Sequence, residues 1–117
     1  MSLTTHVLDT MHGTPAAGMR VALYTTRSGD VLLVKNVVLS SDGRNPGGPL
    51  LETAELQVGT YRLVFDVAAY FLALGVALPE PPFFDQVTLD FGLADTQAHC
   101  HVPLLVSPYS YSTYRGS

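Results

Sequence analysis

The chain has few of the features that mark membrane, nucleic-acid-binding or disulfide-stabilised proteins. Its single cysteine, Cys100, cannot form a disulfide within the chain, which suits a reducing compartment or indifference to redox conditions. Ten acidic and six basic residues give a net charge of −4, and no basic run occurs, so we expect no nucleic acid as a partner. The longest apolar run, residues 67–74, is too short to span a bilayer. Residues 1–5 lack the basic and apolar segments of a signal peptide, so we expect a cytoplasmic protein that does not bind membranes.

Several catalytic motifs are also missing. The sequence has no G-x-S-x-G elbow for a nucleophilic serine, no phosphate-binding loop and no dinucleotide fingerprint. Cys100 shares a strand face with Val102 and Leu104, so we expect it to be a small core residue and not a nucleophile.

Charged residues are scarce, at 14%, whereas hydrophobic residues make up 47% and the mean hydropathy is +0.25. This composition is consistent with extra apolar surface buried between subunits. The length of 117 residues corresponds to a single domain, 1–117, which is long enough to bury a core without disulfides.

What the chain does contain is a series of short alternating segments with turn residues between them. We expect strands at residues 4–9, 19–25, 31–39, 61–66 and 83–91, followed by two C-terminal strands within 99–117. Residues 50–56 are a candidate edge strand, and 41–48 form a loop. Residues 67–74 lack Gly and Pro and are rich in Ala and Leu, so we expect one short helix that stops at Gly75. The pattern predicts an all-β sandwich.

The four histidines, His6, His12, His99 and His101, are the main candidates for chemistry. A single histidine is most often a surface or capping residue. However, alternation places His101 with His99 and Leu105 on the strand face opposite Cys100, Val102 and Leu104. The second set is the better core face, so we expect His101 to point outward into an interface or cleft. Pro103 also lies in this strand, where proline is normally restricted to edges or bulges.

Two further interpretations concern charge and metal. Arg44 ends the turn sequence Asp42-Gly43-Arg44, so it is either a solvated turn residue or a guanidinium that forks onto a carbonyl or ureide group. His6, His99 and His101 could supply three nitrogens to zinc. No metal-binding motif spacing supports that alternative, and we expect no metal.

The C-terminal residues 99–117, which end in Tyr114-Arg115-Gly116-Ser117, resemble the C-terminus of the transthyretin-like 5-hydroxyisourate hydrolases. The Ser-Pro-Tyr-Ser-Tyr-Ser-Thr part is equally similar to transthyretin itself, whereas the Y-R-G-S ending and the paired histidines favour the hydrolases. The remaining matching segments are His6-Val7-Leu8-Asp9, Gly13-Thr14-Pro15-Ala16, Asp42-Gly43-Arg44, Gly59-Thr60-Tyr61 and Phe83-Phe84. The family commonly has Tyr where Cys100 stands, a difference that we expect to affect packing more than mechanism.

This resemblance implies a transthyretin-like (prealbumin-like) β-sandwich of two four-stranded sheets with one short helix. It also implies a homotetramer, a dimer of dimers, with active sites where the dimers meet. The implied reaction is the ring-opening hydrolysis of a C–N bond in 5-hydroxyisourate, a small-molecule substrate of urate and purine degradation, without cofactor or metal.

The same resemblance implies the site residues. His6, Arg44 and His101 would be catalytic, and Tyr114, Arg115, Gly116 and Ser117 would bind substrate. An imidazole is a suitable base to activate water near neutral pH, and a guanidinium can stabilise the developing oxyanion. Which of His6 and His101 is the base stays open.

Two alternatives come from other functional classes. A small-ligand carrier would share the fold, but the Y-R-G-S ending and the histidine pair argue against it. A structural or adhesive β-sandwich module would be expected to carry a linker or a neighbouring domain.

Overall fold

The computed structural model describes residues 2–116, which fold into two stacked β-sheets and one short helix. The first sheet has the strand order β2-β1-β8-β9, and β5 pairs with β1 at its other end. Strand β1 runs parallel to β8, whereas the other pairs in this sheet are antiparallel. Its strands are β1 (Ser2–Asp9), β2 (Thr14–Pro15), β5 (Leu51–Glu52), β8 (Cys100–Val106) and β9 (Tyr111–Thr113).

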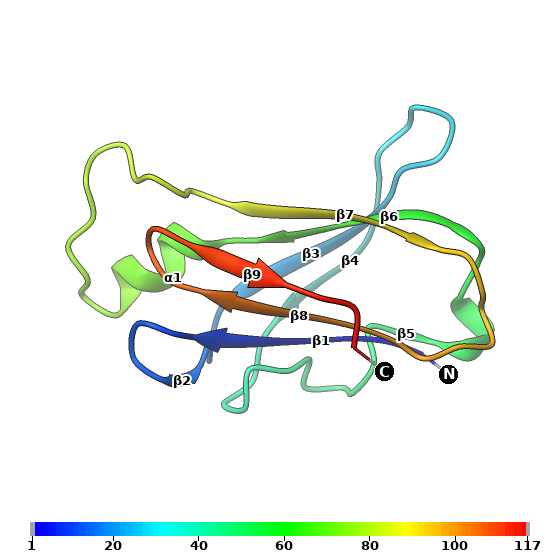
Figure 1. Cartoon of the computed structure of the whole chain (residues 1–117), viewed down its shortest axis with the longest axis horizontal. Helices are drawn as coiled ribbons and strands as arrows, with labels where there is room; N and C mark the ends of the chain where they lie inside the picture. The colour runs from blue at the N-terminus through cyan, green and yellow to red at the C-terminus, as the bar shows by residue number, and fades with distance from the viewer. Residues whose placement is uncertain (1, 117) are drawn as a thin grey trace.

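The second sheet is antiparallel throughout, with the strand order β4-β3-β6-β7. Its strands are β3 (Arg20–Thr25), β4 (Leu32–Val38), β6 (Gly59–Phe65) and β7 (Val87–Leu93). Helix α1 (Val67–Ala73) follows β6, and a 3-10 turn, η1 (Thr53–Glu55), follows β5. The start of β1 and the segment after β9 lie toward the end of the sandwich opposite α1 (Figure 1).

The alternation of the sequence matches the burial of the strands. In β1 the buried side chains are Leu3, Thr5, Val7 and Asp9, whereas Thr4, His6 and Leu8 are only half-buried on the outward face. In β8, Cys100, Val102 and Leu104 are buried toward the second sheet, as the sequence predicts. The all-β sandwich and its single helix are therefore confirmed.

Three details of the prediction are wrong. The first sheet has five strands because the two-residue strand β2 is hidden within what reads as turn sequence. Residues 50–56 form only the two-residue strand β5 before η1, since the Glu55 side chain accepts a hydrogen bond from the backbone N–H of Glu52 at 2.9 Å and starts the turn. Strand β7 begins at Val87 and not at residue 83, because its partner strand β6 ends at Phe65, directly opposite Val87.

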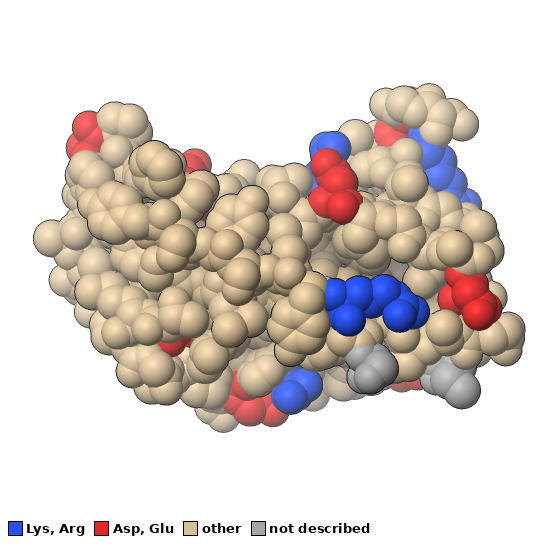
Figure 2. Space-filling model, in the orientation of Figure 1, with Lys and Arg blue, Asp and Glu red and all other residues tan. Residues whose placement is uncertain are grey.

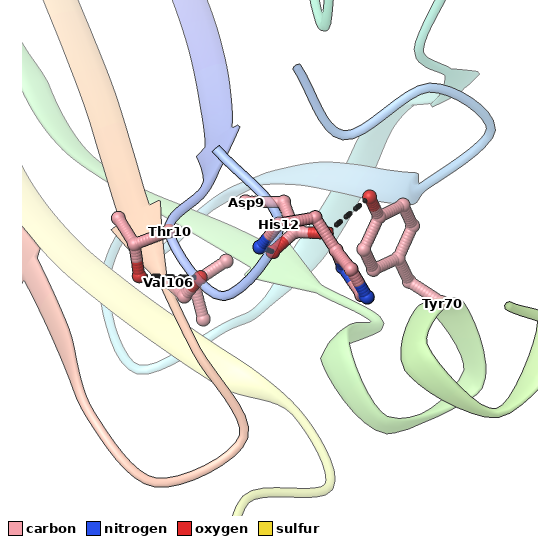
Figure 3. Close-up of polar contacts among 5 residues, drawn as sticks. All are labelled: Asp9, Thr10, His12, Tyr70 and Val106. Carbon is pink, nitrogen blue, oxygen red and sulfur yellow. Dashed lines mark hydrogen bonds and ion pairs between the residues drawn. The ribbon is translucent and has the colours of Figure 1, made fainter. Parts of the chain in front are cut away.

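A buried polar cluster joins the end of β1 to helix α1 (Figure 3). The carboxylate of Asp9 is fully buried and accepts hydrogen bonds from the Tyr70 hydroxyl at 2.8 Å and from His12 Nδ1 at 2.6 Å. The backbone N–H of His12 donates a third at 3.0 Å. Burial alone would raise the pKa of Asp9, but the bonds from His12 and Tyr70 together hold it below its ordinary value. His12 is thus a capping residue of this cluster, located away from the other histidines.

Candidate active site

The parallel pairing of β1 and β8 brings two histidine-bearing segments together. The register places Thr4 opposite His101 and His6 opposite Pro103. Because side chains alternate between faces, Thr4, His6 and His101 all project from the outward face of the sheet. All three are half-buried, so each remains accessible from outside the core.

The loop that carries Arg44 is fixed against β1. The backbone of Arg44 forms an isolated antiparallel bridge with His6, and the N–H of Val7 donates to the carbonyl of Gly43 at 3.0 Å. Gly43 has a positive φ of 74°, and a Cβ there would meet the Val7 carbonyl oxygen at 2.5 Å. Glycine is therefore required for the loop to approach this strand.

Polar contacts within the loop are made by the backbone of Arg44, whereas its side chain is exposed. The Arg44 carbonyl accepts hydrogen bonds from the backbone N–H and the hydroxyl of Ser40, both at 2.9 Å. The Asp42 carboxylate accepts from the Ser40 hydroxyl at 2.5 Å and from the Arg44 N–H at 3.2 Å, and the Ser40 bond is the main cause that lowers the pKa of Asp42. A cavity of about 330 Å³ lies between this loop and Thr4.

The C-terminal tail, the residues that follow β9, lies against His101 on the edge of β8 that faces away from β1. His101 and Gly116 exchange two backbone hydrogen bonds, of 3.3 Å and 2.7 Å. A Cβ at Gly116 would lie 2.9 Å from Cδ2 of the His101 ring, so the absence of a side chain lets the tail pass directly over the imidazole. The tail thus contacts His101 itself.

The position of Pro103 has a physical explanation in this pairing. The ladder pairs Leu104 with Thr113 and His101 with Gly116 in one register, which sets Pro103 opposite Tyr114. Proline has no N–H to donate there. Strand β9 accordingly ends at Thr113, whose hydroxyl donates to the Pro103 carbonyl at 2.7 Å.

The remaining predicted tail residues are placed differently from one another. Tyr114 is 60% exposed and sits at the register position on the histidine side of the ladder. Arg115 turns back over the start of β8, where its Nη2 lies 3.5 Å from the His99 carbonyl oxygen and it also interacts with Cys100. Burial is the main cause that raises the pKa of the Cys100 thiol. Ser117 lies outside the described residues.

Sequence reasoning missed the polar support of His101. The Thr4 hydroxyl lies 2.7 Å from His101 Nδ1 and 3.4 Å from His99 Nε2, and the Ser2 hydroxyl lies 3.1 Å from His99 Nδ1. The rings of His99 and His101 are nearly parallel, with centroids 6.5 Å apart. Alternation within each strand indicates the shared face, but it does not give the register between strands nearly a hundred positions apart.

The protonation state of His101 follows from its surroundings. Burial lowers the pKa of its imidazole below the usual 6.5, and positive charge on Arg44, His99 and His6 lowers it further. His101 is therefore mostly neutral at pH 7, with one ring nitrogen free to accept a proton. Within residues 2–116, no group of three His, Cys, Asp or Glu side chains is arranged to hold a metal ion.

This chain is similar to a family of sequences and to several solved structures. A sequence model of the HIUase/Transthyretin family matches residues 3–116. 5-Hydroxyisourate hydrolase 2 of Rhizobium meliloti is 53% identical over 115 residues, covering 98% of this chain and 95% of its own length. 5-Hydroxyisourate hydrolase of Ralstonia nicotianae is 54% identical over 115 residues, covering 98% and 97%.

Among solved structures, 5-hydroxyisourate hydrolase of Klebsiella pneumoniae superposes with a TM-score of 0.79 at 33% identity and covers all of both chains. Sea bream transthyretin in complex with thyroxine gives a TM-score of 0.87 at 25% identity, covering 99% of this chain and 95% of the other. (S)-allantoin synthase gives a TM-score of 0.93 at 45% identity, with 99% of this chain matched to 43% of that longer chain.

Proposed function

The chain belongs to the HIUase/Transthyretin family, and from this membership we propose that it hydrolyses 5-hydroxyisourate at a site formed by His6, Arg44 and His101. It is an enzyme that opens a ring by hydrolysing a C–N bond of a cyclic amide, as part of urate and purine degradation. The observation that carries the site assignment is the convergence of three distant segments on one imidazole. Strand β1 and the tail both pair with the backbone at His101, and the Arg44 loop pairs with His6 on β1, close enough for its charge to act on His101.

The chemistry requires a base, an oxyanion partner and a proton donor. A neutral imidazole can take a proton from water as the water attacks the ring carbonyl. The lowered pKa of His101 supports it as this base, with His6 positioning the water on the same face. The guanidinium of Arg44 forms two parallel hydrogen bonds to the flat ureide and stabilises the oxyanion. The protonated imidazole then returns its proton to the departing nitrogen.

We assign substrate binding to the tail residues Tyr114, Arg115, Gly116 and Ser117. The backbone pair between Gly116 and His101 supports this assignment, because it holds the tail against the reacting imidazole. Tyr114 is exposed on the histidine side, where its hydroxyl can bond the polar rim of a bound ring. Ser117 is included because it is the last residue of the Y-R-G-S motif.

The working form of the enzyme is a homotetramer, a dimer of dimers with active sites where the dimers meet. Charged residues are sparse on the face drawn in Figure 2. Strands β7 and β9 end their sheets within the described residues, and such free edges favour pairing between subunits. The outward histidine face carries the half-buried Leu8 and Leu105, which a second dimer would cover.

A small-ligand carrier is the alternative, since the fold is shared with transthyretin. The test is a stopped-flow measurement on 5-hydroxyisourate generated enzymatically from urate. Catalytic acceleration of its decay is expected. A carrier would bind the compound and leave the rate of decay unchanged.

A further inference from the structure

Four polar side chains form a continuous line on the outward face where β1 and β8 begin. Thr4 Oγ1 lies 2.7 Å from Nδ1 of His101 and 3.4 Å from Nε2 of His99. The other nitrogen of the His99 ring, Nδ1, lies 3.1 Å from the Ser2 hydroxyl. The line therefore runs from the His101 imidazole through one hydroxyl to a second imidazole and a second hydroxyl. Nothing in the ring-opening chemistry itself requires these additional groups.

The donors and acceptors along this line are consistent in one direction. If His101 is the base, its Nε2 must be free, so its proton sits on Nδ1 and is donated to Thr4 Oγ1. The Thr4 hydroxyl can then donate its own proton to Nε2 of His99. His99 in turn carries its proton on Nδ1 and donates it to Ser2. Every group is satisfied, and in this direction the Thr4 hydroxyl accepts from Nδ1 of His101 and leaves its Nε2 free.

We propose that Thr4 and His99 form a proton relay behind His101, in which Thr4 orients the His101 imidazole and His99 receives its proton. The inference rests on the proposed function, in which His101 removes a proton from water. Thr4 and His99 are positioning residues in this arrangement, because neither needs to touch the substrate.

Protons balance in the relay. When Nε2 of His101 takes a proton from the attacking water, its Nδ1 proton passes to Thr4 Oγ1. The Thr4 hydroxyl proton passes at the same time to Nε2 of His99, which becomes an imidazolium. His101 is left neutral, with its proton on Nε2. As the extra proton of His99 returns through Thr4 to Nδ1 of His101, Nε2 gives its proton to the departing nitrogen, which restores the starting state.

The charged groups around His101 favour this transfer. His6 faces it from β1, Arg44 from the loop before β5 and His99 from the position just before β8. Arg115 from the tail contacts the His99 carbonyl at 3.5 Å, so its charge acts against the protonation of His99. Arg44 and His6 disfavour a positive charge on His101. Transfer of the proton from His101 to His99 moves this charge away from Arg44 and is therefore favoured.

The relay is tested with three variants and one matched control. Thr4→Val removes the hydroxyl at nearly constant shape, and Thr4→Ser restores it. His99→Gln keeps a polar group near Thr4 but cannot accept a proton. Thr5→Val is the control, because Thr5 is the next residue of β1 and its hydroxyl donates to the Val102 carbonyl on the core side.

Two measurements separate the relay from a structural role. The first is the pH profile of kcat and kcat/KM on 5-hydroxyisourate. We expect kcat to fall roughly tenfold or more in Thr4→Val and His99→Gln, the scale of one lost hydrogen bond to the base, with KM little changed. Thr4→Ser should recover most of the rate. In His99→Gln the acidic limb should move to higher pH, because the positive charge that lowers the pKa of His101 is gone.

The second measurement is the nitrogen NMR spectrum of the imidazoles in the free enzyme. His101 should carry its proton on Nδ1 in wild type and in Thr4→Ser, and should lose that preference in Thr4→Val. This readout does not depend on the substrate.

A wild-type enzyme that accelerates decay while Thr4→Val and His99→Gln match Thr5→Val in rate and pH profile would overturn the relay alone. A proton found on Nε2 of His101 in the free wild-type enzyme would also overturn it. A wild type without activity would instead overturn the proposed function.

Discussion

Two glycines set how closely the chain approaches the histidines, but what each one meets is different. A Cβ at Gly43 would meet a backbone atom, the Val7 carbonyl oxygen, and the residue also has a positive φ. A Cβ at Gly116 would meet only the ring and Cβ of His101, which is a side chain that can rotate. We therefore expect a side chain at Gly43 to lower the stability of the fold, and a side chain at Gly116 to lower activity.

Replacing Gly116 with Ala should reduce activity and leave the fold intact. The methyl group would push the His101 ring away from its position beneath the tail. A misplacement of a catalytic group by about 1 Å costs about a hundredfold in rate, and we expect a loss of this order in kcat/KM. Steady-state kinetics and thermal unfolding measure the two effects. In the contrasting variant, Gly43→Ala, unfolding should become easier by at least about 1–2 kcal/mol because of the left-handed backbone. Unchanged kinetics in Gly116→Ala would show that the tail does not position His101.

Replacing Arg44 with Lys should also leave the fold intact. The structural contacts of this residue are made by its backbone N–H and carbonyl, while its side chain is exposed. Lysine keeps the charge and loses the fork, so we expect activity to fall by about a hundredfold, the scale for one oxyanion donor. The rate on 5-hydroxyisourate and the far-ultraviolet circular dichroism spectrum check this. A near-normal rate would make Arg44 an ordinary turn residue.

At the residue scale, alternation alone predicts that His101 points outward, because Cys100, Val102 and Leu104 form the better core face. It does not predict the contact of His101 with Thr4, since that depends on the register between β1 and β8. The roles proposed for His6 and Arg44 rest on the resemblance and not on local pattern. The Arg44 loop reaches β1 through the backbone at Gly43, which no side-chain pattern reveals.

At the scale of elements, the prediction was right for segments that have a clear periodicity of their own. It was wrong where pairing with a neighbouring strand sets the residue at which a strand begins or ends. Helix α1 ends one residue short of the expected Leu74, and Gly75 follows with a positive φ of 82°. Residues 83–86 have strand-like composition, but β6 has turned into α1 before it could pair with them. Their aromatic rings pack instead on each other and on the tyrosines around the start of β9, as in the edge-to-face contact of Phe84 with Tyr111, whose ring centroids are 5.4 Å apart.

The cluster of Asp9, His12 and Tyr70 joins the end of β1 and the turn after it to helix α1, and it makes stability depend on pH (Figure 3). The pKa of Asp9 in the folded state lies below its ordinary 3.8, so its contribution to stability is complete above that value and is lost as pH falls through the folded pKa. For Tyr70, burial first and the Asp9 carboxylate second raise the pKa to about 12. The neutral phenol is thus favoured by folding, and its contribution disappears as pH rises from about 10 to about 12.

Replacing Tyr70 with Phe should therefore destabilise the fold and flatten its pH dependence. One hydrogen bond to a buried carboxylate is removed, at a cost of about 1.5–3 kcal/mol near neutral pH. Urea unfolding followed by circular dichroism at acidic, neutral and alkaline pH measures the effect. The difference between wild type and Tyr70→Phe should shrink at both extremes. A difference that stays constant across the pH range would mean that the contribution of Tyr70 does not depend on the titration of Asp9 or of the phenol, and no difference at any pH would mean that the bond contributes nothing to folding.

At the scale of the whole molecule, the site is open on one side in a single chain. His6, His101 and the neighbouring Leu8 and Leu105 are only half-buried, although two elements and the tail surround them. A reaction that stabilises an oxyanion by electrostatics benefits from exclusion of water. A second copy of the outward face would supply that cover and bury the leucines, which is why assembly and activity should depend on each other.

A charge placed on this face should separate the dimers and remove activity together. Leu8→Glu introduces a carboxylate beside Leu105, its partner in the parallel register, without altering the core face of β1. Light scattering of the wild type should give a mass near four times the 12.6 kDa of one chain. Leu8→Glu should give half that mass or less, with a normal circular dichroism spectrum and a strongly reduced rate.

The matched control is Val58→Glu, at an apolar residue that is 63% exposed in the loop before β6 and far from the outward face in sequence. A tetramer that persists in Leu8→Glu, or a fully active smaller species, would show that the site is complete within one chain or one dimer, and the histidine face would then need another source of cover.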